Sequence, residues 1–337
     1  MPRIRHQPQI VAVLGAGNMG TALAQVIAGN GHSVRLWSIE TDVLAEIQDR
    51  HTNSKYLDGV RLHDRIVPHW RLDACLDEAR LVVFGVPSQV VGPVARDVAT
   101  YLQPGQLVLN VAKGLEANTC RRMSEVLVRE LGASFHGSAG SMGGPAIAIE
   151  MACGLPMAVI VGMEDPDAST LCQSVLQNDH LKVEATTDLA GVELCSSLKN
   201  VYAIALGMCD GLGFGTNTKA FLATLALGEM SLICSALGGR RDTVYGLAGV
   251  GDLMTTGYSQ HSRNRMLGEM LGSDGDWLDF LLAHTVEGAG ACRALKELIT
   301  GREIRAHLLD TLHEVLFKER PAPEAMRHFF REFSYGS

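Results

Sequence analysis

A glycine-rich segment near the start of the chain, Gly15-Ala16-Gly17-Asn18-Met19-Gly20, has the spacing of a turn that holds a phosphate group. It follows a valine-rich apolar run and leads into an alanine- and leucine-rich stretch, typical of a buried strand and a helix. In such a turn Gly15 permits the tight bend, Gly17 lets a pyrophosphate approach the backbone, and Gly20 lets helix and strand pack closely. The pattern alone also fits an ordinary turn. Because residues 31–37 supply the second strand of a βαβ unit, we predict a dinucleotide-binding site.

Two lysines have the sequence context of proton donors. If a dinucleotide delivers hydride to a ketone, the protein must supply a proton beside the carbonyl oxygen. Lys113 follows an apolar strand, and Lys199 lies in an apolar helix with Ser196, Ala203 and Leu206 on the same face. Burial and a second cation would lower the pKa of such a lysine toward neutrality. The alternatives are an exposed lysine at a helix edge and a solvated loop cation, and the sequence leaves both open.

Two further segments carry charge in unusual places. Asp252 is preceded by a glycine-rich stretch and could pair with a lysine, but it also suits the N-cap of a short helix. Ser262 predicts the start of another helix whose first turn contains Arg263 and Arg265, although cations are disfavoured there. A bound phosphate would resolve the conflict, and so would a neighbouring carboxylate.

The elements that must position these residues change character near residue 188. Before it, apolar strands alternate with helical stretches, which indicates a doubly wound, Rossmann-type α/β domain over residues 1–188. After it, residues 189–337 have mainly helical periodicity and predict an all-α domain that covers the ligand edge of the sheet. The expected strands are 11–14, 33–37, 81–86, 107–112, 157–161 and 181–185. The expected later helices are 189–208, 218–237, 262–271, 277–284, 290–299 and 304–317.

Composition limits the function classes. The chain has 337 residues, 47% hydrophobic and 20% charged, which suits two well-packed domains. A net charge of −8 argues against a general nucleic-acid surface. The eight cysteines and twelve histidines lack metal-ligand spacing, so we expect buried, reduced thiols and no metal site. Residues 1–8 suggest a polar arm rather than a leader, and the apolar segment 201–237 suggests buried helices rather than a membrane span.

Taken together, the motifs resemble the NAD(P)-dependent glycerol-3-phosphate dehydrogenase family. The resemblance implies a Rossmann domain plus a helical domain, usually in a homodimer in the cytoplasm. It implies reversible reduction of dihydroxyacetone phosphate to sn-glycerol 3-phosphate, a phospholipid precursor, with NAD as cofactor and NADP possible. The matching segments are 15–24, 86–88, 113–116, 191–193, 198–201, 210–213, 246–253, 262–265 and 286–288.

The resemblance also implies roles for single residues. Lys199 would be the general acid–base, with Lys113 and Asp252 completing the catalytic group. The substrate would contact Lys113, Gly144, Lys199, Asn200, Asp252, Thr256, Ser262, Arg263 and Asn264. The cofactor would contact Gly15, Gly17, Asn18, Met19, Gly20, Ser38, Pro87, Lys113, Ala148, Arg263 and Glu287.

Two departures keep rival hypotheses open. Where the family usually has Gly-Pro-Ser/Thr-Phe-Ala, this chain has Ala146 and Ile147, and the missing hydroxyl removes a hydrogen bond of about 1 kcal/mol. A dehydrogenase for another small phosphorylated or phosphonate hydroxy-ketone is therefore an alternative, and a non-catalytic nicotinamide-dinucleotide-binding protein is another. After the second strand, Glu40 would repel the 2′-phosphate of NADP, which favours NAD unless Arg35 or Arg61 folds toward it.

Overall fold

The computed structural model describes residues 7–273 and 275–333, in two compact units. The first unit comprises the described residues up to Ala112 together with Met123–Leu189. The second comprises Lys113–Arg122 and the chain from Ala190 onward. Met1 to His6 of the predicted polar arm lie outside the described residues, as do Asp274 and residues 334–337 of the predicted all-α domain.

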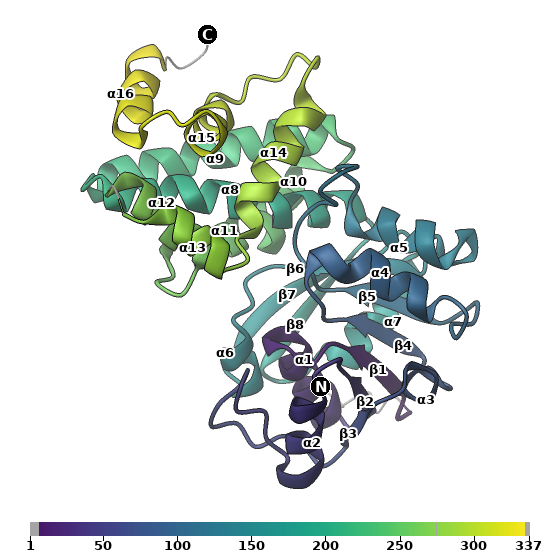
Figure 1. Cartoon of the computed structure of the whole chain (residues 1–337). Coiled ribbons are helices and arrows are strands. Elements are labelled where there is room, and N and C mark those ends of the chain that lie inside the picture. The colour runs from purple at the N-terminus through teal and green to yellow at the C-terminus, as the bar shows by residue number, and fades with distance from the viewer. Residues whose placement is uncertain (1–6, 274, 334–337) are drawn as a thin grey trace. The chain divides into compact units, whose positions relative to one another are not determined.

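The first unit is built on one eight-stranded sheet in the order β3-β2-β1-β4-β5-β6-β7-β8 (Figure 1). Neighbouring strands are parallel except for β6 and β7, so the predicted doubly wound α/β fold is confirmed. The strands are β1 Ile10–Leu14, β2 Ser33–Trp37, β3 Ile66–His69, β4 Leu81–Phe84, β5 Leu107–Asn110, β6 Ala139–Gly143, β7 Met157–Gly162 and β8 Leu181–Thr186. The helices are α1 Asn18–Gly29, α2 Thr41–Arg50, α3 Leu72–Leu76, α4 Ser88–Val98, α5 Met123–Leu131, α6 Ala148–Ala152 and α7 Pro166–Leu176.

Alternating side chains of the central strand β1 enter two separate cores. Val11 and Val13 pack in a cluster with residues of α1 and α7, whereas Ala12 and Leu14 pack in a cluster with residues of α4 and α5. This follows from the two-residue period of a strand. Burial on both faces explains why β1 and its neighbour β4 are almost entirely aliphatic.

Two strands were not predicted, for different physical reasons. β3 is a short strand at the sheet edge and contains Pro68, so it lacks the long aliphatic run of a central strand. β6 is fully buried but lacks an aliphatic run, since it consists of small residues apart from Met142. A Cβ on Gly140 would overlap the backbone of Gly162 in β7. The strand that follows, β7, runs antiparallel to β6.

The described part of the second unit is helical, as predicted. Its longest helix, α8 (Leu189–Gly211), is buried along most of its length. The remaining helices are α9 Thr216–Ala236, α10 Arg241–Tyr245, α11 Asp252–Tyr258, α12 Arg263–Gly272, α13 Trp277–Ala283, α14 Glu287–Ile299, α15 His307–Phe317 and α16 Ala322–Glu332. A π-turn over Leu247–Gly251 joins α10 to α11. This turn, α10 and α16 were not predicted, whereas α11 corresponds to the short helix suggested as the alternative for Asp252.

Three observations bear on the predictions from composition. Helices α8 and α9 are both long and apolar enough to cross a membrane, but 94% of the apolar window of α8 is buried in the protein, against 39% for α9. All eight cysteines are free thiols and seven are buried, so the prediction of burial was wrong only for Cys153, which is exposed. No group of three potential metal ligands occurs among the described residues.

Candidate functional site

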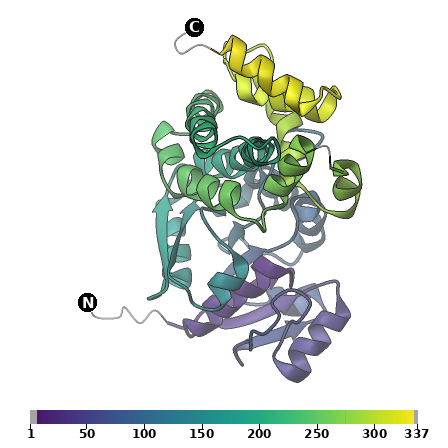
Figure 2. The same ribbon diagram turned by 90° about the vertical axis from the view of Figure 1, so that its left-hand side faces the viewer.

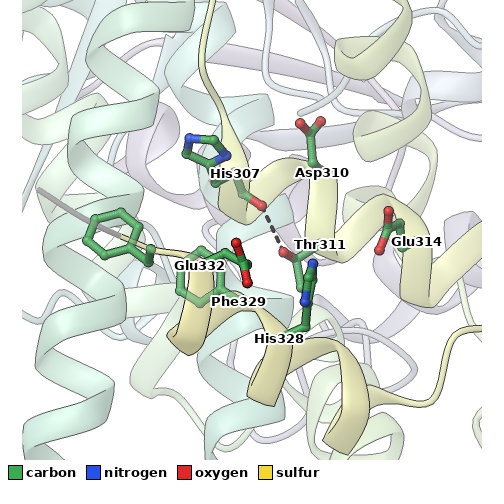
Figure 3. A pocket seen from close by; sticks show the side chains of 8 residues that line it. His307, Asp310, Thr311, Glu314, His328, Phe329 and Glu332 are labelled. Atoms are coloured by element: carbon green, nitrogen blue, oxygen red, sulfur yellow. Dashed lines mark hydrogen bonds between the residues drawn. The ribbon is translucent and has the colours of Figure 1, made fainter. Parts of the chain in front are cut away.

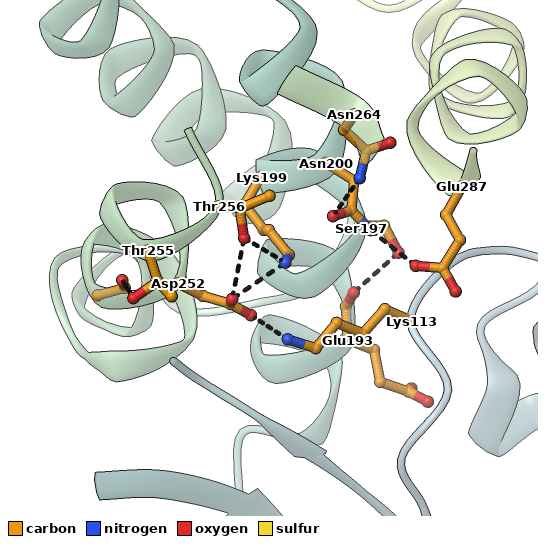
Figure 4. Close-up of polar contacts among 11 residues, drawn as sticks. Lys113, Glu193, Ser197, Lys199, Asn200, Asp252, Thr255, Thr256, Asn264 and Glu287 are labelled. Atoms are coloured by element: carbon orange, nitrogen blue, oxygen red, sulfur yellow. Dashed lines mark hydrogen bonds and ion pairs between the residues drawn. The ribbon is translucent and has the colours of Figure 1, made fainter. Parts of the chain in front are cut away.

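The side chain of Asp252 joins two lysine ammonium groups within the second unit (Figure 4). Its Oδ2 lies 2.6 Å from Lys113 Nζ, and its Oδ1 lies 3.0 Å from Lys199 Nζ. Lys199 Nζ also donates to Thr256 Oγ1 at 2.6 Å. Asp252 begins α11, but Gly251 is the N-cap and no side chain caps this helix. The carboxylate therefore serves the lysines, which decides between the two interpretations of Asp252.

Burial dominates the electrostatics of this cluster. Lys199 is 5% exposed and Asp252 1%, so the alternative of an exposed lysine is excluded for Lys199. Burial, assisted by the nearby charge of Lys113, lowers the pKa of Lys199 to about 8 even though Asp252 opposes the shift. Burial also opposes ionisation of Asp252, but the two lysines outweigh it and hold its pKa below the ordinary value.

A chain of amide groups connects α8 to α12 and α14. Asn264 Nδ2 donates to Asn200 Oδ1 at 3.0 Å, and Asn200 Nδ2 donates to Glu287 Oε2 at 3.1 Å (Figure 4). Asn264 Oδ1 in turn accepts from the backbone N–H of Gly288 at 2.8 Å. Burial raises the pKa of Glu287, and the lysines only partly offset that effect. Two of the residues predicted to contact the substrate, Asn200 and Asn264, are thus linked to each other and to Glu287, a predicted cofactor residue.

The two arginines in the first turn of α12 have different partners. Ser262 is the N-cap, with its Oγ accepting from Arg265 N at 3.3 Å. Arg265 is paired with Asp210 at 2.8 Å, which is the neighbouring-carboxylate alternative. Arg263 is exposed and donates to the carbonyl oxygen of Thr285 at 3.3 Å, and it forms no ion pair with a carboxylate of the described residues. Arg263 is therefore the guanidinium that remains suited to a phosphate.

The glycine-rich turn of the first unit has the close packing that its spacing predicts. Gly15 has a φ of +110°, and a Cβ there would lie 2.7 Å from the carbonyl oxygen of Gly85. A Cβ on Gly20 would overlap the carbonyl oxygen of Gly15, whereas one on Gly17 would meet nothing within 4 Å. Gly17 is also the N-cap of α1 and provides no side-chain cap. Open space beside uncapped N–H groups is what a pyrophosphate requires.

Comparison with known proteins identifies the family. Residues 10–169 match the model of the NAD-dependent glycerol-3-phosphate dehydrogenase N-terminus, and residues 188–327 match that of the C-terminus. The chain belongs to this family. The dehydrogenase is 40% identical over 320 residues to "Glycerol-3-phosphate dehydrogenase [NAD(P)+]" of Geobacillus kaustophilus, covering 94% of this chain and 92% of the relative. It is 36% identical over 319 residues to the protein of the same name from Chlorobium luteolum, covering 94% and 96%.

A solved structure agrees with the sequence matches. The glycerol-3-phosphate dehydrogenase of Coxiella burnetii superposes with a TM-score of 0.88 at 32% identity, covering 96% of this chain and 99% of the other. The chain is accordingly an oxidoreductase that uses NAD or NADP and acts on a small molecule.

In the dehydrogenase, the ammonium group of Lys55 lies beside Glu40, shortly after the end of β2, a contact that the sequence did not reveal. Glu40 is paired with Lys55 and accepts a hydrogen bond from the hydroxyl of Tyr56 at 2.7 Å. These contacts lower the pKa of Glu40. The two arginines considered earlier are engaged elsewhere, because Arg35 donates to the backbone carbonyls of Ala74 and Asp77 and exposed Arg61 pairs with Asp64. Glu40 is thus partly neutralised, which weakens the argument against NADP.

The remaining predicted residues keep distinct local roles. Among the predicted cofactor residues of the first unit, Asn18 Nδ2 donates to the carbonyl of Tyr56 at 2.8 Å, and Ser38 Oγ accepts from Glu40 N at 3.1 Å. Pro87 is the N-cap of α4, Gly144 has a φ of +103°, and Met19 and Ala148 pack against the core. Ala146 packs against that core as well, so an apolar contact stands where the family has a hydroxyl.

Sequence reasoning missed the group that supports the glycine-rich turn. Asn53 is fully buried and donates through Nδ2 to the carbonyl of Ala16 and to Thr21 Oγ1, both at 2.9 Å. Thr21 Oγ1 donates to the same carbonyl at 3.0 Å. The only sequence signal is a lone asparagine after the second helix, and such residues are common in turns.

A cavity of about 170 Å³ lies between α15 and α16 (Figure 3). These two helices, drawn in yellow, contact each other near the end of the chain (Figure 2). The cavity is lined by His307, Asp310, Thr311, Glu314, His328, Phe329, Glu332 and Phe333. It shares no residue with the lysine cluster, and two of its carboxylates are already paired, Asp310 with Lys296 and Glu314 with Arg320.

Proposed function

We propose that Lys199 is the general acid–base with which this dehydrogenase reversibly reduces dihydroxyacetone phosphate to sn-glycerol 3-phosphate. The observation that carries the proposal is the position of the Lys199 ammonium group. It is buried, and its recorded partners among the described residues are Asp252 and Thr256. An ammonium group has three N–H donors, so one is left to point at a substrate oxygen.

The chemistry of reduction divides between cofactor and protein. A bound reduced nicotinamide would supply the hydride for the carbonyl carbon of the substrate. Lys199 gives its proton to the carbonyl oxygen, so the C=O double bond becomes a CH–OH group and the lysine is left as a neutral amine. Asp252 holds Lys199 and Lys113 in place and balances part of their charge. Lys113 adds positive charge beside the site where negative charge develops on oxygen.

The other predicted contacts fit the remainder of the substrate. We assign the phosphate to the first turn of α12, with Ser262, Arg263 and Asn264 as its ligands. The exposed fork of Arg263 and the N–H groups of this ten-residue helix support that assignment. Asn200 and Thr256 are assigned to the substrate hydroxyl groups. Gly15, Gly17, Asn18, Met19, Gly20, Ser38, Pro87, Ala148 and Glu287 are assigned to the cofactor, together with Lys113 and Arg263.

An absorbance assay at the nicotinamide band tests the reaction. The purified protein is given dihydroxyacetone phosphate with NADH and, separately, with NADPH, and we expect oxidation of at least one cofactor with release of glycerol 3-phosphate. The control reactions omit the substrate or replace it with other phosphorylated and phosphonate hydroxy-ketones. Turnover of such an analogue with none of dihydroxyacetone phosphate would favour the rival substrate, for which Ala146 is the motivating residue. Cofactor binding without any turnover would favour a binding protein.

We also propose that the enzyme acts in the cytoplasm as a homodimer and feeds phospholipid synthesis. Glycerol 3-phosphate is a phospholipid precursor, and helix α9 leaves much of its apolar surface uncovered within one chain. Sedimentation of the purified enzyme tests the dimer, and a single species with the mass of one chain would contradict it.

A further inference from the structure

Helices α8 and α12 meet backbone to backbone through four glycines, two on each helix. The pairs are Gly207 with Gly211 and Gly268 with Gly272, each separated by one helical turn and so lying on one face. A Cβ on Gly207 would overlap the carbonyl oxygen of Arg265, and one on Gly211 would overlap that of Glu269.

The contact is reciprocal. A Cβ on Gly268 would overlap the carbonyl oxygen of Ile204, and one on Gly272 would lie 2.7 Å from that of Met208. Real Cβ atoms essentially never come within 3.0 Å of such atoms, so no other residue fits at these positions without moving a helix. Most helix pairs pack with their axes about 8–10 Å apart, at a distance set by their side chains. Here the backbones themselves touch, and sliding α12 by one residue would drive a side chain into α8.

Each helix carries one part of the proposed site. Gly207 follows Lys199 and Asn200 by two turns of α8, which is about 12 Å along the axis from Lys199. Gly268 follows Asn264 by about one turn of α12, or about 6 Å. The Asn264–Asn200 hydrogen bond spans the two helices at 3.0 Å, and the ion pair between Arg265 and Asp210 joins them again at 2.8 Å. Lys199, the proposed proton donor, and the proposed phosphate-binding turn therefore lie on two helices that cannot slide along each other without a clash.

We propose that these four glycines are positioning residues that fix the distance between Lys199 and the phosphate-binding turn of α12. The inference rests on the proposed function, because it takes Lys199 as the acid and Arg263 as a phosphate ligand. None of the four glycines is among the residues assigned to the substrate. Because they fix the spacing of the two helices, a substrate whose phosphate is bound at α12 has its carbonyl placed at Lys199. A displacement of about 1 Å can cost a hundredfold in rate, so this spacing matters for a phosphorylated substrate.

The test compares Gly268→Ala and Gly207→Ala with Gly228→Ala, in which a Cβ on α9 would meet nothing within 4 Å. For each protein we measure kcat/KM with dihydroxyacetone phosphate and with dihydroxyacetone, which lacks the phosphate. NADH affinity from fluorescence and the unfolding temperature report on folding. Alanine is a better helix former than glycine, so helix propensity cannot account for a loss. If Gly268→Ala does not yield folded protein, Gly272→Ala replaces it, because its contact is looser and at the helix end.

We expect kcat/KM for dihydroxyacetone phosphate to fall about tenfold or more in the contact variants and to stay unchanged in Gly228→Ala. The value for dihydroxyacetone and the affinity for NADH should not change. An unchanged value for dihydroxyacetone phosphate in a folded contact variant would overturn the inference. An equal loss for both substrates would overturn it too, because the glycines would then support only the general fold. Lys199→Ala is run in the same series, and full activity of that variant would instead refute the proposed function.

Discussion

The glycine-rich turn of the first unit and the lysine cluster of the second depend on different physical features, open space in the first and buried charge in the second. The turn comes from residues 15–20, adjacent in sequence and without charged side chains, and it works by leaving space at Gly17. The cluster brings together Lys113, Lys199 and Asp252, which lie up to 139 positions apart, and it works by burying charge. The turn thus takes its shape mainly from neighbouring residues, with support from Asn53 farther along the chain. Tuning a proton donor requires burial and partners from distant segments.

The strongest test of the comparison removes the buried amine. Lys199→Ala should lower turnover at least about a hundredfold, because it removes the buried amine proposed to protonate the carbonyl oxygen. Binding of NADH, measured by fluorescence, should be nearly unchanged, since the glycine-rich turn is intact. Lys182→Ala is the matched control, as it removes an exposed lysine on β8. Turnover like that of the unmodified enzyme would exclude Lys199 as the acid.

A second test removes the guanidinium at the start of α12. Arg263→Ala should raise KM for dihydroxyacetone phosphate roughly tenfold to a hundredfold, the equivalent of a lost charge-assisted hydrogen bond of about 1.5–3 kcal/mol. Steady-state kinetics measure the change. Arg263→Lys should recover only part of it, because an ammonium group lacks the bidentate fork. A KM that stays the same in Arg263→Ala would move the phosphate to another part of the protein.

The pH dependence follows from the pKa of about 8 at Lys199. Reduction needs the protonated amine, so kcat/KM for dihydroxyacetone phosphate should be nearly constant below pH 8 and fall about tenfold for each pH unit above it. Oxidation of glycerol 3-phosphate needs the neutral amine and should increase over the same range. Initial rates across the alkaline range measure both profiles, and a flat profile for reduction would contradict the assignment.

The turn is tested by adding one methyl group. Gly20→Ala places a Cβ against the carbonyl of Gly15, so it should lower the free energy of unfolding by about 1–3 kcal/mol and weaken NADH binding. Gly29→Ala, at the end of the same helix and next to open space, should do neither. Chemical denaturation and fluorescence titration measure the two effects. Equal behaviour of the two variants would remove Gly20 from the cofactor turn.

The smallest expected effect concerns cofactor choice. Lys55→Ala frees the carboxylate of Glu40, which should weaken NADPH binding about twofold to fivefold and leave NADH binding nearly unchanged. Calorimetric titration with the two cofactors measures the ratio, with Lys182→Ala again as the control. A parallel change for both cofactors would show that Lys55 does not discriminate between them.

The sequence predicted the fold better than it predicted the burial and the partners of the charged side chains. Near-continuous aliphatic runs identified β1 and β4, because a strand buried on both faces has little alternative. β3 and β6 escaped notice because an edge strand tolerates Pro68 and a tightly packed strand requires Gly140. The segment Lys113–Arg122 belongs to the second unit although it follows β5 of the first, and its Arg122 pairs with Glu193 of α8 at 3.4 Å.

The sequence by itself determined the dinucleotide turn, the alternation of strands and helices and the later all-α unit, since each depends on neighbouring residues or on a short period. It also identified Lys199, Asp252 and Arg263 as residues that needed partners. Only the tertiary structure decided which partners they have, pairing Asp252 with both lysines and Arg265, rather than Arg263, with a carboxylate. The physical reason is that burial and charge pairing depend on segments far apart in the chain, and no local pattern records which of them will meet.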